Sequence, residues 1–486
     1  MTELLALIAG KRVGASDGRV LPVINPATGQ QIGVIPRCTP EDADRAVEAA
    51  STAFSTWRKT DPGTRAACVL RFAEAVERDA ERLLELEVSD NGSPRSELRV
   101  DIRVGIDHLR YFAGLTYQLR GETIPTAHDR LNFTRREPFG VVVRVLPFNH
   151  PIMFALSRLA APLLAGNTLI IKPSEHTSLS TLALADQLSD CFPEGVVSVV
   201  PGLGAEVGDA LITHPKVRRI AFIGSLTTGL AIQARAATSS VKHVSLELGG
   251  KSPLVVFPDS DKDAALDAAV AGLRTNFQGQ ACGATTRLFV HQSWYSEFTS
   301  ELAQRLGALR VGDPNDPTTQ VGATVNLAQL EKVLGFVDAG RAEGATVLVG
   351  GDRLQEGEMG NGYFMAPTLL SDVDPRSPVA QQEIFGPVLV ASPFNDYDEA
   401  VALSNDVSFG LTAGVFTSNL ETALSYARDV EAGYVWVNEN QRHFPGTPYG
   451  GVKDSGLGRE EDFSELESYT QIKNVHIAFD SRSNHR

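Results

Sequence analysis

Cys282 is the residue whose neighbours best suit covalent chemistry. It stands in the segment 276–287 beside Ala281 and Gly283, with Gly279 close by, so little bulk surrounds its sulfur. A thiolate is a strong nucleophile even when only a small fraction of the thiol is ionised. The pattern favours a nucleophile that a substrate approaches closely. A small, buried and unreactive side chain is the alternative that this segment leaves open.

Two polar residues follow apolar strands and suit acid–base chemistry. Glu247 ends one strand, and burial there would raise the pKa of its carboxyl group toward a general base's working range. Asn149 lies where another strand meets its helix, and its amide can donate to a developing oxyanion. The alternatives are a surface carboxylate or a partner for Lys251 in the first case, and a helix N-cap before Pro151 in the second.

Other segments have the residue types of a nucleotide site. Lys172 and Glu175 follow a strand, where they could grip ribose hydroxyls. Gly224 and Ser225 open a turn from strand to helix, a natural place for a diphosphate against a helix N-terminus. The turn lacks the G-x-G-x-x-G fingerprint. Ordinary solvated loops are the alternative here, as they are for the glycine-rich segment 448–460.

The elements that must position these residues alternate between strand and helix. Strands are predicted at 141–146, 168–171, 196–200, 219–223 and 241–246, with helices at 151–165, 178–190, 204–213 and 227–237 between them. This alternation predicts a doubly wound parallel sheet, which binds ligands beyond the carboxyl ends of its strands.

The remaining segments complete an α/β chain. Helices are predicted at 41–57, 64–88 (with Leu70 on the apolar side) and 97–118, and the first 40 residues read as strands with a turn at 25–29. A second α/β series begins at 254, with helices near 261–276, 294–308 and 327–342 and strands at 388–391 and 434–437. The polar segment 121–138 is predicted as a strand pair, and 467–479 as one more strand.

Composition and charge exclude several classes of function. The 486 residues contain 44 basic and 59 acidic side chains, a formal net charge of −15, which argues against nucleic-acid or membrane-surface partners. The four scattered cysteines form no metal-binding spacing, so no metal site is expected, and they suit a reducing cytoplasm. The apolar stretch 4–9 is too short for a membrane span and lacks the features of a signal peptide.

Taken together and in order, these segments resemble the aldehyde dehydrogenase superfamily. The matching motifs lie at 147–151, 172–175, 224–229, 246–251, 279–282, 383–387 and 450–460. The resemblance implies an α/β fold with a Rossmann-like parallel-sheet cofactor domain, an α/β catalytic domain and a small β oligomerisation arm. These would span 1–119 with 139–249, 250–465, and 120–138 with 466–486.

The resemblance also implies the catalytic roles. Cys282 would attack the aldehyde, Asn149 would stabilise the oxyanion, and Glu247 would activate the water that releases the acid. Glu460 would join a proton path behind Glu247. The expected cofactor residues are Phe148, Lys172, Glu175, Gly208, Gly224, Ser225, Leu248, Glu383 and Phe385. NAD is expected rather than NADP, because the Glu175 carboxylate would repel a 2′-phosphate.

The substrate residues expected from the resemblance are His150, Met153, Phe154, Ser157, Asn276, Phe277, Ala281, His443 and Tyr449. Many members carry tryptophan where this chain has Phe148, and an aromatic or apolar residue where it has His150. Such a funnel favours an aromatic or bulky aldehyde with a polar substituent. Relatives that take succinic semialdehyde place arginines at positions that here correspond to Ser157 and Asn276, although Arg442 could still reach inward.

Several alternatives remain at this stage. They are an aliphatic semialdehyde dehydrogenase, a CoA-acylating relative, a cofactor-free cysteine hydrolase and a non-catalytic binding protein on the same fold. The CoA-acylating relatives typically lack the base found here as Glu247, and loss of Cys282 or Glu247 would have favoured the non-catalytic protein. A homodimer or a homotetramer is expected.

Overall fold

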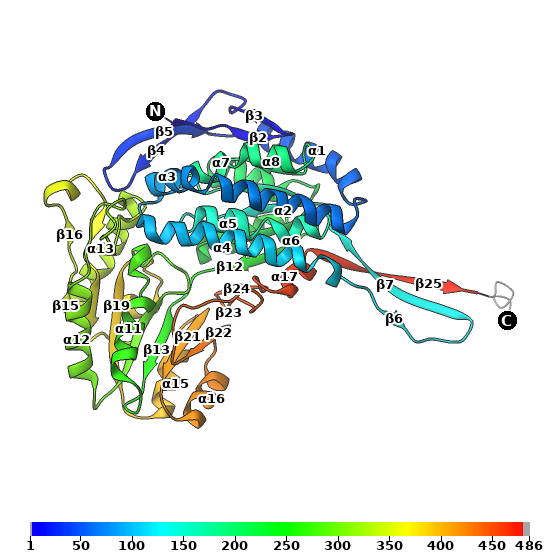
Figure 1. The fold of residues 1–486 in the computed structure, drawn as a ribbon. Helices are drawn as coiled ribbons and strands as arrows, with labels where there is room; N and C mark the ends of the chain where they lie inside the picture. The colour runs from blue at the N-terminus through cyan, green and yellow to red at the C-terminus, as the bar shows by residue number, and fades with distance from the viewer. Residues whose placement is uncertain (1, 480–486) are drawn as a thin grey trace.

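The computed structural model describes residues 2–479, which form two α/β bodies and a projecting arm (Figure 1). The first body is built on an eight-stranded sheet whose five central strands are parallel, in the order β12–β11–β8–β9–β10. The predicted doubly wound sheet is therefore confirmed. Its strands, from edge to edge, are β24 (Gly456–Leu457), β12 (His243–Glu247), β11 (Val217–Ile223), β8 (Val141–Val145), β9 (Thr168–Lys172), β10 (Val197–Val199), β2 (Ala6–Ile8) and β3 (Lys11–Val13).

Helices cover both faces of this sheet because side chains alternate along its buried strands. In β8, Val142 packs into one apolar core, and its neighbours Val141 and Val143 pack into the other. The first core is covered by α2 (Pro62–Arg78), α3 (Ala80–Asn91), α4 (Arg95–Gly114), α5 (Pro151–Ser157), α6 (Ala160–Leu164), α7 (Leu179–Ala183) and α8 (Ala185–Cys191). The second is covered by α1 (Pro40–Trp57), α9 (Asp209–Thr213) and α10 (Leu226–Ala236).

The second body has a seven-stranded sheet that is parallel except at one edge. The chain enters it directly, since only residues 248–251 separate β12 of the first sheet from β13 of the second. The strands are β15 (Thr346–Val349), β18 (Thr368–Ser371), β19 (Val388–Phe394), β14 (Thr285–His291), β13 (Ser252–Val256), β21 (Thr412–Phe416) and β22 (Tyr434–Val437). The helices are α11 (Lys262–Gly272), α12 (Tyr295–Gly307), α13 (Leu327–Ala342), α14 (Pro378–Gln381), α15 (Tyr397–Asn405) and α16 (Leu420–Asp429).

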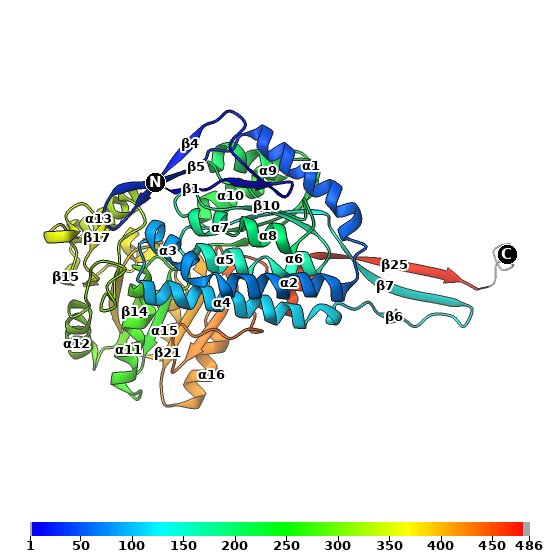
Figure 2. The ribbon, with the colours of Figure 1, turned by 45° about the horizontal axis from the view of Figure 1, so that its top comes forward.

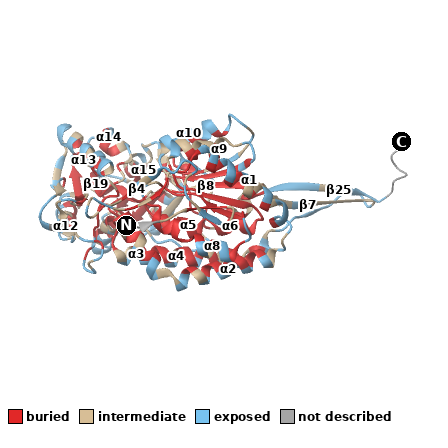
Figure 3. Cartoon of the chain, turned by 90° about the horizontal axis from the view of Figure 1, so that it is seen from above, coloured by how far each residue is buried: buried red, intermediate tan, exposed pale blue. Residues whose placement is uncertain are grey.

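The arm is a three-stranded antiparallel sheet that extends away from both bodies (Figures 1 and 3). It joins β6 (Thr123–Ile124) and β7 (Arg130–Pro138) to β25 (Thr470–Ala478), which pairs with β7 along its whole length. The strand predicted at 467–479 begins only at Thr470, because α17 (Phe463–Ser468) precedes it. The last seven residues of the predicted arm, 480–486, lie outside the described residues.

The N-terminal segment forms strands, as predicted. β4 (Val20–Asn25) and β5 (Gln30–Pro36) form an antiparallel pair across the top of the first body, with β1 (Thr2–Glu3) beside β5 (Figure 2). The predicted turn between them is closed by a hydrogen bond of 2.8 Å from the Gly29 N–H to the Asn25 carbonyl. The apolar stretch near the start supplies β2 to the large sheet. Among residues 2–479, none of the helices has the length and apolar character needed to cross a bilayer.

Several predicted helices are broken where a side chain is used elsewhere. The helix predicted at 64–88 divides at Asp79, whose carboxylate accepts hydrogen bonds from Arg82 and Gln187, and Leu70 is exposed rather than buried. The helix at 151–165 divides at Arg158, which points into a buried ion network. Four other predicted helices have different bounds in the structure. The helix predicted at 97–118 ends in a 3₁₀ turn at 116–118, and the one at 178–190 divides at 184. The one at 204–213 opens with a π turn at 204–208, and the one at 261–276 ends at 272.

Gly279 tests how tightly the loop that precedes β14 packs against the segment just before β19. Its φ is +67°, and a Cβ there would lie 2.2 Å from the Gly386 carbonyl carbon and oxygen. We expect Gly279→Ala to lower the free energy of unfolding by at least about 1–3 kcal/mol, from the backbone conformation alone. The measurement is the midpoint of thermal or urea unfolding.

Gly335 supplies the matched control for this substitution. It lies on the exposed side of α13, and a Cβ there would meet nothing within 4 Å. Gly335→Ala should raise stability by roughly 0.5–1 kcal/mol, because alanine loses less backbone freedom than glycine in a helix. Equal midpoints for the two variants would show that the 276–284 loop is not held as the structure indicates.

Candidate active site

Two cavities meet at Cys282. One, of about 880 Å³, runs along the carboxyl ends of the first sheet, and the other, of about 430 Å³, opens on the opposite side of the sulfur. Glu247 and Asn149 line the larger cavity with Cys282. The structure therefore gathers the three residues predicted to be catalytic around one space. They come from separate elements: Asn149 follows β8, Glu247 ends β12, and Cys282 precedes β14.

Cys282 lies in a loop with unusual backbone geometry. Gln278 and Gly279, four and three residues before it, both have positive φ angles, which turn the chain sharply before β14. Burial raises the pKa of the Cys282 thiol to about 12, and a hydrogen bond from Tyr449 opposes that rise. The Tyr449 hydroxyl oxygen is 3.8 Å from the sulfur. The Tyr449 hydroxyl is therefore a neighbour that favours ionisation of the thiol.

Glu247 is almost completely buried, and one of its carboxylate oxygens has no hydrogen-bond partner among the described residues. Burial, with a further contribution from the charge of Glu460, raises the pKa of Glu247 well above its ordinary value. The strand around it is held on both sides, since Gly224 N–H donates to the Glu247 carbonyl at 3.0 Å. On the other side β24 pairs antiparallel with β12. A fixed carboxyl group with a raised pKa is suited to accepting a proton near neutral pH.

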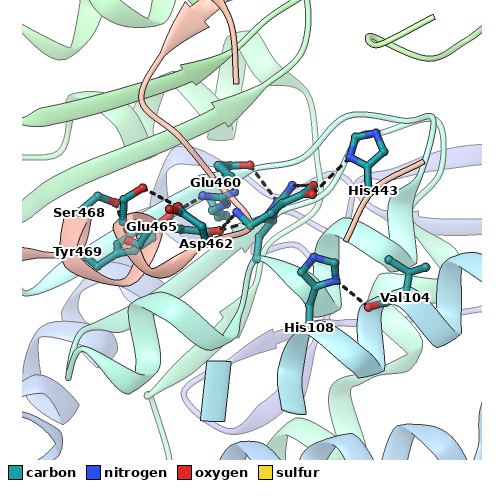
Figure 4. A network of polar contacts seen from close by, with 12 residues as sticks. Val104, His108, His443, Glu460, Asp462, Glu465, Ser468 and Tyr469 are labelled. Carbon is teal, nitrogen blue, oxygen red and sulfur yellow. Dashed lines mark hydrogen bonds and ion pairs between the residues drawn. The ribbon is translucent and has the colours of Figure 1, made fainter. Parts of the chain in front are cut away.

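Glu460 lies in a buried network of charges (Figure 4), and its charge acts on Glu247. Its carboxylate pairs with Arg144 of β8 and lies 2.9 Å from Nε of Arg158. Arg158 also reaches Glu461 at 2.9 Å and Glu465 at 3.5 Å. Burial opposes ionisation of Glu460, but the two arginines outweigh it and hold its pKa below the ordinary value. The network continues to His443, whose Nδ1 is 3.5 Å from Glu461.

Asn149 is held by its backbone, so its side chain remains free to face the cavity. The Asn91 side-chain amide, at the end of α3, donates to the carbonyls of Phe148 and Asn149, both at 3.1 Å. The Thr177 hydroxyl donates to the Phe148 carbonyl at the same distance. No hydrogen bond to the Asn149 side chain is found among residues 2–479. The sequence indicated Asn149 but gave no sign that Asn91 positions it.

Most of the predicted cofactor residues line the larger cavity. They are Phe148, Lys172, Glu175, Gly208, Gly224, Ser225, Glu383 and Phe385. Leu248 does not line this cavity: it is buried beneath α10, where a Cβ on Gly229 would lie 2.6 Å from it. Gln329 and Lys332 of α13 also line the cavity, and sequence reasoning missed them. No motif marked them, because they face the cavity only through the packing of α13.

The two ends of this cavity differ in chemistry. At one end Lys172 Nζ lies 3.2 Å from Glu175 Oε2. Burial opposes ionisation of Glu175, but the Lys172 charge outweighs it and lowers the pKa of Glu175. At the other end burial raises the pKa of Glu383 to about 7. The Gly250 N–H donates to the Glu383 carboxylate at 3.2 Å.

The larger cavity also has features suited to a dinucleotide. Ser225 caps the N-terminus of α10, with its hydroxyl accepting from the Thr228 N–H at 3.3 Å. Phe148 and Phe385 meet edge to face with their ring centres 5.5 Å apart. A volume of about 880 Å³ with carboxylates at both ends and a helix N-terminus between them matches the parts of such a ligand.

The smaller cavity contains the predicted substrate residues His150, Met153, Phe154, Ser157, Phe277, Ala281, His443 and Tyr449. Asn276 is the exception: it does not line this cavity, and its amide donates to Glu97, which does, at 2.7 Å. Arg274 and Arg158 occupy the wall instead, and Arg442 does reach it. Sequence reasoning missed Arg158 and Arg274, since their direction depends on a helix break and a turn.

Comparison with known proteins gives one consistent result. The family model of the aldehyde dehydrogenase family matches residues 13–475. The aldehyde dehydrogenase tropH of Talaromyces stipitatus is 43% identical over 462 residues, covering 93% of this chain and 89% of that protein. An NAD⁺ complex of an aldehyde dehydrogenase from Bacillus cereus is 38% identical, with a TM-score of 0.96, covering 99% and 97% of the two chains. A betaine aldehyde dehydrogenase from Staphylococcus aureus with NAD⁺ is 32% identical, with a TM-score of 0.97 and coverage of 99% and 96%.

The contact between Tyr449 and Cys282 predicts a change in thiol reactivity. Tyr449→Phe removes the hydrogen bond that lowers the pKa of Cys282, so a smaller fraction is ionised at any pH below that pKa. We expect iodoacetamide to alkylate Cys282 about threefold more slowly at pH 8, equivalent to roughly 0.7 kcal/mol. The rate is measured by mass spectrometry of the Cys282 peptide between pH 6 and 10.

Tyr434→Phe is the control, because Tyr434 packs in the same aromatic cluster, 5.9 Å from Tyr449 between ring centres. Its hydroxyl makes no hydrogen bond within the described part of the chain. The control should alkylate as the unmodified protein does. Identical pH profiles for all three proteins would contradict a role for the Tyr449 hydroxyl.

Proposed function

The chain belongs to the aldehyde dehydrogenase family, and on that premise we propose that it oxidises an aldehyde to the carboxylic acid with NAD. The observation that carries the proposal is the position of Cys282 at the junction of two cavities. One cavity suits a dinucleotide and the other a small apolar molecule with polar substituents. A nucleophile between them can hold the substrate carbon against a hydride acceptor.

Cys282 is proposed as the nucleophile. The thiol first passes its proton to the carboxylate of Glu247, which lines the same cavity. The resulting thiolate attacks the aldehyde carbon, forming a carbon–sulfur bond and converting the carbonyl oxygen into the oxyanion of a thiohemiacetal. The Asn149 amide and the Cys282 backbone N–H donate hydrogen bonds to that oxygen. The Asn91 amide keeps the Asn149 backbone in place throughout, so that the donor does not need to reorganise.

Glu247 is proposed as the base of the second half-reaction. NAD, when bound in the larger cavity, accepts the hydride that leaves the thiohemiacetal carbon, so that a thioester on Cys282 remains. Glu247 removes a proton from the water that attacks this thioester, and the acid leaves as the carbon–sulfur bond breaks. The buried network around Glu460 takes part by setting the pKa of Glu247 and by offering a route for the proton.

NAD is proposed over NADP because of the charge on Glu175. Lys172 favours the ionised form of that carboxylate, which would accept from ribose hydroxyls and repel a 2′-phosphate. Arg235 also lines the cavity, but both arms of its guanidinium bind Asp209, at 2.7 and 2.6 Å. A 2′-phosphate would have to compete with Asp209 for these two donors. The Bacillus cereus and Staphylococcus aureus structures hold NAD⁺.

The substrate is proposed to be an aromatic or otherwise bulky aldehyde. The smaller cavity has aromatic walls: His150 lies 4.2 Å from Phe277 between ring centres, and His443 lies 4.8 Å from Tyr449. Polar groups on these walls are held in fixed positions, since Asp101 binds His150 at 2.7 Å. Planar substrates gain the most from such walls.

A homodimer or homotetramer is proposed from the arm. Ile472 and Ile477 of β25 are 65% and 38% exposed, as is Ile124 of β6 at 42%. Exposed apolar side chains on a projecting sheet can be buried against a second copy of the chain.

A cytoplasmic site of action is proposed because all four cysteines are free thiols.

The test of this function is an aldehyde panel with NAD and NADP in parallel. Benzaldehydes, linear aldehydes and semialdehydes are compared by kcat/KM from the absorbance of the reduced cofactor. We expect benzaldehydes with NAD to be preferred. A short linear aldehyde better by more than tenfold, about 1.4 kcal/mol, would contradict the substrate class. Comparable kcat/KM with both cofactors would contradict the cofactor assignment.

Cys282→Ala is the blank in this assay and should abolish cofactor reduction. Glu247→Gln should still form the acyl-enzyme in a single burst and then stall, because the base for hydrolysis is missing. Adding CoA separates the acylating alternative, since a thioester of CoA would then be the product. Absence of cofactor reduction with every aldehyde would favour a non-catalytic protein.

The charge of Glu460 predicts a shift in the pH dependence of turnover. Activity depends on ionised Glu247, so it is lost as pH falls through the raised pKa of that group. Glu460→Gln removes a like charge, which lowers the pKa of Glu247 and moves the acid limb to lower pH. We expect the pH at which kcat falls on the acid side to decrease by about one unit, equivalent to roughly 1.4 kcal/mol. The measurement uses a substrate that shows a burst of cofactor reduction, because hydrolysis then limits kcat.

Glu467→Gln is the control for that shift. Glu467 pairs with Arg136 on the arm, at 2.5 Å, rather than with the buried arginines. The activity of Glu467→Gln should fall on the acid side at the same pH as that of the unmodified enzyme. An unmoved acid limb in Glu460→Gln would mean that Glu460 serves stability alone.

A further inference from the structure

Arg274 is placed in the substrate cavity by a strained turn. Its φ of +56° and ψ of +42° are left-handed, a conformation that is unfavourable for any residue with a Cβ. It stands between α11 and the 3₁₀ turn Thr275–Phe277, in the loop that ends at Cys282. A strained backbone conformation is kept only when the surrounding structure holds it. Here it positions the Arg274 side chain in the wall of the cavity.

Three arginines line this cavity, and only two of them have carboxylate partners. Arg158 reaches Glu460, Glu461 and Glu465. Arg442, at the rim, lies 3.4 Å from Glu439. Arg274 has no carboxylate within 4 Å and no hydrogen bond to its guanidinium among residues 2–479. Its guanidinium carbon lies 4.8 Å from the centre of the Phe277 ring.

The carboxylates of the cavity interior are already committed to other groups. Asp101 binds His150 at 2.7 Å, and Glu97 accepts from Asn276 at 2.7 Å. Glu461 is shared between Arg158 and His443. Asp107 also lines the cavity but is exposed at its rim. The positive charge of Arg274 is therefore not neutralised at contact distance by any of these groups.

Burial makes the unpaired positive charge of Arg274 still less favourable. It lowers the pKa of Arg274, and the more distant charges of Asp101 and Glu97 oppose that effect. Cys282 and Tyr449 are also among the groups whose charge acts on Arg274. The guanidinium thus faces the same small space as the nucleophile, where an aldehyde bound to Cys282 would extend toward it.

We propose that Arg274 binds a carboxylate at the distal end of the aldehyde, so that the preferred substrate is an aldehyde acid with a planar or apolar spacer. The proposal rests on the proposed function and narrows it. A guanidinium donates two parallel hydrogen bonds to a carboxylate, and this pairing would supply the partner that the protein does not. The Phe277 and His150 rings would lie along the spacer, and Arg274 thereby takes the role that Ser157 and Asn276 cannot fill.

The test compares two aldehydes that differ only in the carboxylate. The ratio of kcat/KM for carboxybenzaldehyde, as the 3- and 4-isomers, to that for benzaldehyde is measured with NAD. We expect a ratio of at least ten for the better isomer. Arg274→Gln should reduce that ratio at least tenfold, mainly through KM. Arg310→Gln is the control, because Arg310 pairs with Asp316 at 2.6 Å and lines neither cavity, so its ratio should equal that of the unmodified enzyme.

The outcomes separate this inference from the proposed function. If benzaldehyde is oxidised but the carboxylate gives no preference, or if Arg274→Gln leaves the ratio unchanged, the inference is overturned and the function stands. If neither aldehyde supports reduction of NAD, the proposed function itself fails. Because Arg274→Gln could alter the strained turn, Arg274→Lys is included: it keeps the charge but not the paired donors, so it should retain part of the preference.

Discussion

Glu460 must be ionised where water does not reach, and much of the active site depends on how the fold meets that requirement. A buried carboxylate is costly unless it is paired. Arg144 on the central strand and Arg158 after α5 supply the pairing. The pairs hold the segment after β24 against the first sheet, so that a carboxylate from near the C-terminus lies behind the base on β12. Glu461 and Glu465 then share Arg158, which extends the same network to α17 and to His443.

The network also explains a local irregularity of the fold. The chain leaves the helical path at Arg158, with φ −94° and ψ 2°, and α5 and α6 form in place of one longer helix. Buried acids play a similar part elsewhere: Glu87 of α3 accepts from the Ile152 N–H at 3.1 Å, and Asp90 accepts from the Leu179 N–H at 2.9 Å. The short helices at the carboxyl ends of the parallel strands thus begin on side chains from α3.

The sequence carried more information about the larger cavity than about the smaller one. Residues such as Glu247, Lys172 and Ser225 immediately follow predicted strands, and the geometry of a parallel sheet brings such positions to one edge. The alternation of strands and helices predicted the parallel sheet, but the order of its strands and the pairing of β25 with β7 come from the structure. Helix breaks at Asp79 and Arg158 were missed, because they depend on partners more than a hundred residues away or on pairing in three dimensions.

The direction of Asn276 and Arg274 shows why the substrate side is harder to predict. Both stand a few residues before Cys282, and the family resemblance favoured Asn276 for the cavity. In the structure the Asn276 amide donates to Glu97, and Arg274, in its left-handed turn, takes the place of Asn276 in the wall of the cavity that Cys282 also lines. This exchange has an electrostatic consequence for catalysis. A substrate carboxylate near Glu247 would raise the pKa of that base further and slow hydrolysis at neutral pH. Pairing the carboxylate with Arg274 cancels most of its field, so that an acidic substrate would be bound without disturbing the base that completes its oxidation.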